Sequence, residues 1–187
     1  MPQPSKSQNA AILDKLANVG VVMRGGYGQV RAEIARPPNT TQYSPLDAVA
    51  DASPSATTHR FANAARKVGG SGAILNARVM TDNLAWTNAL TLIVYDTPPT
   101  AFVADNEAFD EKWVDRDSIV TEITFPSMVT FKGEAGSFRR ADASALNEGF
   151  TCGDDSNDLY FQAVLSSGTP TPAENQIFAF KLGVLRD

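Results

Sequence analysis

The sequence has 187 residues, of which 43% are hydrophobic and 20% are charged, and its formal net charge is −5. This composition excludes a disordered chain, and 16 basic against 21 acidic residues leave no broad basic surface for binding nucleic acid. The single cysteine, Cys152, excludes an internal disulfide framework and a cysteine-based zinc site.

Two further absences concern membranes and export. No apolar run approaches the ~20 residues that a membrane-spanning helix needs. The first residues of the chain also lack the apolar core of a secretory signal. We therefore expect no membrane partner, and synthesis in a reducing cytoplasm without export through a visible signal.

Residues 1–28 are predicted to form an N-terminal arm with a short amphipathic helix. Within residues 8–18, the apolar side chains of Ile12, Leu13 and Leu16 recur at helical spacing. Such a helix either packs on its own domain or docks on a neighbouring subunit, and the sequence leaves both possibilities open. Ile12, Leu13 and Leu16 are the candidate subunit-contact residues.

A glycine-rich stretch, residues 25–28, follows the arm. A phosphate-binding glycine loop needs a strand before it and a helix after it, whereas the next residues, 29–34, alternate as a strand does. We interpret these glycines as a flexible joint between the arm and the first strand, a role that needs no ligand.

Most of the remaining chain has the pattern of short β-strands that glycine and proline interrupt. The expected strands are residues 29–34, 73–80, 90–97, 118–125, 128–131, 159–165 and 176–185, with a further strand near Phe150. The run 90–97 is predicted as the central strand, because its middle is apolar on both faces and Pro98 and Pro99 end it. Residues 44–47 are predicted as a turn, and residues 132–147 show no clear period.

One short helix is expected between two of the strands. Asp105 can act as its N-cap, and Phe109 and Trp113 would then share one face of a helix that ends near Val114. The sequence therefore predicts a mainly β fold. This is an antiparallel β-sandwich or jelly roll of about eight or nine strands over residues 29–187, with a short N-terminal helix and one short inserted helix.

The residues with catalytic potential are few. His59, the single histidine, lies among small polar residues and is interpreted as an ordinary loop histidine. Cys152 lacks the local signature of a nucleophile and is interpreted as a small buried hydrophobe. Tyr43, Trp86 and similar aromatic residues are expected mainly in the core. We expect no catalytic residue, no cofactor and no metal site, so the chain is not predicted to be an enzyme.

Two acidic stretches leave alternatives open. The first has six carboxylates between Asp105 and Asp117, which could serve glycoside hydrolysis or cation binding but more often form a solvated face. The second, Asp154 to Asp158, resembles part of a calcium loop, although Leu159 stands where the EF-hand pattern needs glycine. A hairpin turn explains the second stretch without an ion, and an irregular Ca²⁺ site is the alternative.

Four segments, taken together, resemble a family of tailed-bacteriophage virion structural proteins. The segments are Arg36-Pro-Pro-Asn-Thr-Thr-Gln-Tyr43 with residues 44–49, Phe61-Ala-Asn-Ala-Ala-Arg66 with residues 69–75, residues 90–99 with 104–109, and Asp158-Leu-Tyr-Phe-Gln-Ala-Val-Leu165 with residues 169–173. The resemblance covers about residues 36–185. The chain departs from the family pattern after Tyr43, where Ser44-Pro45-Leu46-Asp47 stands in place of Ala-Gly-Asp.

The resemblance implies a β-sandwich that decorates the outer surface of a phage head as a cement protein. Its implied partners are the major capsid protein and further copies of itself, most simply as a trimer on a threefold axis. No catalytic residue comes with the resemblance. Two alternatives stay open: a tail, baseplate or head-fibre adhesin that binds a host glycan or protein, and, less favoured, a hydrolase of surface sugars.

Overall fold

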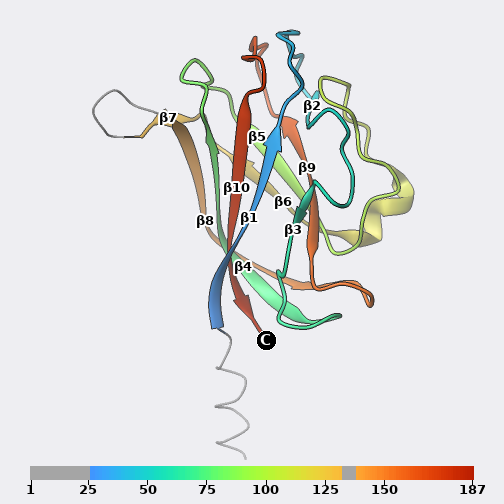
Figure 1. Ribbon diagram of the computed structural model, residues 1–187. Helices are drawn as coiled ribbons and strands as arrows, with labels where there is room; N and C mark the ends of the chain where they lie inside the picture. Colours follow the sequence, from blue (N-terminus) through green and yellow to red (C-terminus); the bar gives the residue numbers. More distant parts are fainter. Residues whose placement is uncertain (1–25, 132–137) are drawn as a thin grey trace, which may run out of the picture.

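Ten β-strands and one 3₁₀ helix make up the part of the chain that the computed structural model describes, residues 26–131 and 138–187 (Figure 1). The strands are β1 (Gly26–Ala35), β2 (Ala48–Val49), β3 (Arg60–Phe61), β4 (Ser71–Thr81), β5 (Leu90–Tyr95), β6 (Ile119–Phe125), β7 (Val129–Thr130), β8 (Arg139–Thr151), β9 (Leu159–Leu165) and β10 (Ile177–Arg186). The 3₁₀ helix, η1, spans Trp113–Ser118. None of these residues forms a helix that is long and apolar enough to cross a membrane.

The strands form two antiparallel sheets, which confirms the mainly β prediction. One sheet has the order β1-β10-β4-β8-β7 and the other the order β2-β9-β5-β6, with β3 also paired to β9. β1 pairs with β10 along its whole length, from Gly26 opposite Arg186 to Ala35 opposite Ile177. The first described residue and the C-terminus therefore lie at the same end of the molecule (Figure 1).

The core lies between the two sheets. Along β10, the alternate residues Phe178, Phe180, Leu182 and Val184 are fully buried, as the period-2 pattern of this strand predicts. The rings of Phe161 on β9 and Phe180 on β10 stand 5.4 Å apart and join the two sheets. A cluster of this kind provides most of the stabilisation of a sandwich, since burial of each large side chain contributes roughly 1.5–3 kcal/mol.

β5 occupies the central position that the sequence predicts, between β9 and β6. Leu90, Leu92 and Val94 are fully buried on its inner face. Thr91 and Ile93, on its outer face, are only half-buried, so the strand is not enclosed on both sides in its middle. The other sheet does not cover this outer face, and part of it remains open to a partner.

Three expectations differ from the structure. Residues 105–112 are not helical, and η1 begins later, at Trp113, because the backbone near Asn106 and Glu107 instead bonds to Ala48. Gly26 and Gly28 are not a joint but belong to β1, which pairs with β10 to its last residue. β8, in the stretch without a clear period, is a long strand that is mostly exposed or half-buried, with positive φ at Ala145 and Asn147.

Several predictions fall on residues that the structure does not describe. These are residues 1–25 of the predicted arm 1–28, the helix predicted within residues 8–18, and the candidate contact residues Ile12, Leu13 and Leu16. They stay predictions.

Candidate functional site

His59 is buried, in contrast to the expected ordinary loop histidine. Its ring packs against Phe161 and Phe102, with centroid distances of 5.3 and 5.7 Å. Nδ1 lies 3.0 Å from Thr58 Oγ1, and Nε2 has no hydrogen-bond partner among the described residues. Burial lowers the pKa of His59 to about 4, against a smaller opposite effect from the Asp51 carboxylate. A neutral imidazole that packs against two phenylalanine rings therefore contributes to side-chain packing.

The carboxylates of the first acidic stretch are separated and used individually. Asp105 pairs with Arg36, and Asp115 accepts hydrogen bonds from the backbone N–H and the hydroxyl of Thr100. Glu111 accepts a hydrogen bond from the Tyr95 hydroxyl. Asp105 and Asp115 are thus not part of a solvated face, because each compensates buried donors. The described residues contain no group of three or more His, Cys, Asp or Glu that could hold a metal ion.

The residues of the second acidic stretch also hold the local structure. Asp158 accepts a hydrogen bond from the backbone N–H of Asn63 at 2.8 Å and pairs with Arg60 at 3.0 Å. Asn157 donates to the Asn63 side-chain oxygen at 3.1 Å. These contacts join the loop before β9 to the loop after β3, which favours the structural interpretation over a calcium loop.

Cys152 and most of the aromatic residues lie where the sequence places them. Cys152 is buried, and burial raises the pKa of its thiol to about 11. Tyr43, Trp86 and Tyr95 are buried in the core, with Trp86 packed edge-on against both Tyr43 and Phe178. Trp113 is the exception, since it is 79% exposed and the guanidinium of Arg116 lies over its ring.

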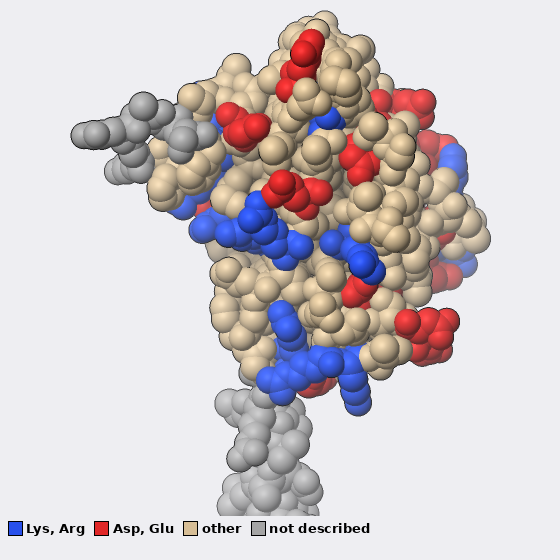
Figure 2. All heavy atoms as spheres, in the orientation of Figure 1, with Lys and Arg blue, Asp and Glu red and all other residues tan. Residues whose placement is uncertain are grey.

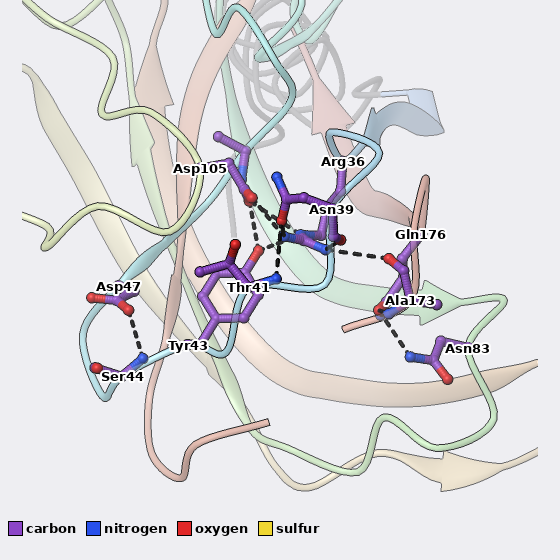
Figure 3. A network of polar contacts seen from close by, with 11 residues as sticks. Arg36, Asn39, Thr41, Tyr43, Ser44, Asp47, Asn83, Asp105, Ala173 and Gln176 are labelled. Atoms are coloured by element: carbon purple, nitrogen blue, oxygen red, sulfur yellow. Dashed lines mark hydrogen bonds and ion pairs between the residues drawn. The ribbon is translucent and has the colours of Figure 1, made fainter. Parts of the chain in front are cut away.

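A buried polar network around Arg36 fixes the loops at one end of the sandwich (Figure 3). The Arg36 guanidinium, at the end of β1, contacts both carboxylate oxygens of Asp105 and donates to the carbonyl of Ala173 at 3.3 Å. Tyr43 donates its hydroxyl hydrogen to Asp105, and burial and this carboxylate raise the pKa of the phenol. Three loops that are distant in sequence are therefore held in one arrangement.

The network positions the turn Ser44-Pro45-Leu46-Asp47, which follows Tyr43 directly. The Asp47 N–H donates to the Ser44 carbonyl at 3.1 Å, and the Asp47 carboxylate accepts from the Ser44 N–H. Leu46 has φ = +70°. Proline at the second position and a positive φ at the third define a type II turn, in which the third residue is normally glycine or asparagine. Leucine in this conformation is strained by about 1–2 kcal/mol.

Leu46 also places an apolar side chain in solvent, since it is 61% exposed. Its backbone is fixed, because its N–H donates to Leu165 and its carbonyl accepts from Phe109, at 2.9 and 2.8 Å. The strained backbone destabilises the isolated chain, and the exposed leucine leaves apolar area that a partner could bury. Strain of this kind is concentrated at functional sites.

Leu46 borders an apolar groove on the outer face of the sheet that contains β9, β5 and β6. The groove has a volume of about 250 Å³, and its lining is mainly apolar, with Leu46, Ile93, Phe109, Ile119 and Val164. Glu111 and Glu122 give the groove an acidic border, and Thr91 and Ser166 complete the lining. We define these residues as the Leu46 groove.

Sequence reasoning did not identify this groove. The pattern of residues 90–97 predicts a strand that is apolar on both faces around Ile93, and Phe109 is expected on a helix that does not form. One usable signal was present: the pair Pro45-Leu46 stands in a turn where glycine or asparagine is expected at the second of these positions.

No known protein-family model matches the chain, and no curated protein matches it in sequence. Among solved structures, the capsid of Ralstonia phage GP4 is similar over 87% of this chain and 86% of that chain, with 16% identity and a TM-score of 0.39. At this distance no residue role is transferred from that structure.

Proposed function

We propose that the protein is a structural component of a tailed-phage virion, and that it decorates the outer surface of the head as a cement protein. The observation that carries the proposal is Leu46, an exposed leucine held at a strained φ beside an apolar groove. This arrangement has a cost in the free chain, and burial against a partner would offset it. The partner we propose is the major capsid protein, at junctions between its subunits.

The strand order supports a jelly-roll body, a common architecture of virion proteins. When β3 and β7 are set aside and the equally short β2 is kept, the sheets run β1-β10-β4-β8 and β2-β9-β5-β6. Numbered along the chain, these eight strands have the order 1-8-3-6 and 2-7-4-5, which is the order of a jelly roll. The sequence resemblance to virion proteins supports the same conclusion, whereas a fold alone does not assign a function.

The charge supports a position on the outside of the shell. The chain carries a net charge of −5. A protein with this charge is repelled by packaged DNA. We further propose a homotrimer on a threefold axis, since three weak groove contacts would act together through avidity.

The experiment is co-sedimentation of the purified protein with phage heads that lack it. Leu46→Asn removes the apolar side chain while keeping a residue that tolerates the positive φ. The matched control is Val68→Thr, which alters another exposed apolar residue, 57% accessible, outside the groove. We expect wild type and Val68→Thr to sediment with the heads and Leu46→Asn to bind at least tenfold more weakly, the loss of about 1.4 kcal/mol.

Equal binding by wild type and Leu46→Asn would contradict the role of the groove. If the wild-type protein does not co-sediment with the heads at any concentration tested, the decoration role itself is contradicted.

A further inference from the structure

A polar basin lies on the outer face of the sheet formed by β1, β10, β4 and β8, the sheet that does not carry the Leu46 groove. It has a volume of about 380 Å³, within the range of small-molecule sites. Seven polar side chains from these four strands line most of it: Tyr27, Gln29, Asn76, Arg78, Asp142, Ser144 and Lys181. The strand register places Gln29, Asn76 and Ser144 in one row across the sheet.

The floor of the basin is Gly183, on β10. A Cβ atom at this position would lie 2.5 Å from the side-chain oxygen of Asn76 and 2.8 Å from the hydroxyl of Tyr27. Any side chain at residue 183 would therefore displace these polar groups. The amides of Gln29 and Asn76 also hydrogen bond to the Tyr27 phenol and lower its pKa. Several hydrogen-bond donors and acceptors therefore surround Gly183, which has no side chain.

The basin lies in a region of positive charge on an acidic protein. In the three central rows of the face, the basic residues are Arg31, Arg78, Arg140 and Lys181, and the acidic residues are Glu33 and Asp142. Figure 2 shows basic side chains gathered across the middle of this side of the molecule, with acidic groups beside them.

Among the described residues, the ion pairs on this face leave one basic side chain, Lys181, without an acidic partner. Arg78 and Arg140 both contact Asp142, and Arg31 contacts Glu33. Lys181 makes no ion pair with any residue that the structure describes, and it lies beside Gly183 on the basin wall. Its ammonium group can therefore meet an anionic ligand without first losing a partner.

We propose that this basin binds an acidic saccharide, with a sugar carboxylate at Lys181 and sugar hydroxyls at Asn76, Gln29 and Ser144. Side-chain amides and hydroxyls match the paired donor and acceptor character of sugar hydroxyls. The ring of Tyr27, 58% exposed at the edge of the basin, offers an apolar face for the pyranose. The proposal does not depend on the capsid role, because it concerns the opposite sheet.

The experiment is a titration of the ¹⁵N-labelled full chain with trigalacturonate, followed by amide chemical shifts. Its methyl ester, which lacks the charges, is the ligand control. Lys181→Gln and Asn76→Ala test the site, and Lys112→Gln is the matched control, an exposed lysine outside the basin. We expect saturable shifts centred on Gly183 with a dissociation constant of roughly millimolar, weakened about tenfold in Lys181→Gln.

Three outcomes would overturn the proposal. They are absence of saturable shifts, equal binding of the methyl ester, and equal weakening by Lys181→Gln and Lys112→Gln. The amide spectra of the variants report at the same time whether each one is folded, so loss of binding through unfolding is recognised directly.

Discussion

The guanidinium of Arg36 and the carboxylate of Asp105 form a buried ion pair, with 2.7 Å between Nη2 and Oδ2 and side-chain exposures of 0% and 3%. The two residues are 69 positions apart in the sequence. The pair joins the end of β1 to the loop before η1, and Tyr43 and Ala50 share the same carboxylate. The network therefore determines the position of the turn that carries Leu46.

The first prediction concerns this pair. Asp105→Asn leaves the Arg36 charge buried without its counter-charge, so we expect a loss of about 3–5 kcal/mol in the free energy of unfolding, measured by urea denaturation. Glu33→Gln is the control, because it breaks the exposed Arg31–Glu33 pair and is expected to cost less than about 1 kcal/mol. Similar losses in the two variants would show that the buried pair contributes no more to the free energy of unfolding than the exposed pair does.

The second prediction concerns the strain at Leu46. Leu46→Asn and Leu46→Ala both remove the apolar side chain, but asparagine tolerates a positive φ better than alanine does. We expect Leu46→Asn to be more stable than Leu46→Ala by about 0.5–1 kcal/mol in thermal or urea unfolding. A more stable alanine variant would be inconsistent with a strained turn.

The third prediction concerns His59 and pH. Its pKa is about 4 in the folded chain against 6.5 when unfolded, so between these values the unfolded chain binds more protons. Stability from this residue is present above pH 6.5 and is lost as the pH falls toward 4, by about 3 kcal/mol in total.

Two measurements check the prediction for His59. NMR titration of the imidazole is direct, because the chain has one histidine. His59→Gln should also make the unfolding free energy fall less steeply with acidification than it does in the wild type. An imidazole that titrates near 6.5 in the folded protein would disprove the burial effect.

The fourth prediction concerns Cys152. The thiol is buried and its pKa is raised to about 11, so at neutral pH it has little thiolate and little access to reagents. We expect no reaction with a disulfide reagent in the native protein and complete reaction in denaturant. Rapid modification of the native protein would indicate an open route to the core that the structure does not contain.

The sequence predicted the regular strands because their burial follows the chain locally. β10 is an example, since Phe178, Phe180 and Leu182 alternate with less buried residues and all three lie in the core. The position of β5 between two partners was likewise evident from its apolar run and from the prolines that follow.

Elements defined by long-range contacts could not be predicted in this way. Asp105 has the residue type of a helix N-cap, but in the fold its carboxylate compensates the buried Arg36 guanidinium. β8 pairs with β4 through an irregular register, and its alternation is lost near Ala145. The Leu46 groove joins residues from five separated stretches, so only the turn at Leu46 gives a local signal.

The measurement that tests the central proposal most directly is immunogold electron microscopy of intact virions with an antibody against this chain. A cement protein on the outer surface of the head predicts gold particles distributed over the whole head. Gold confined to the tail or its tip would contradict the decoration role and favour an adhesin. Virions without label would contradict a position on the outer surface of the particle.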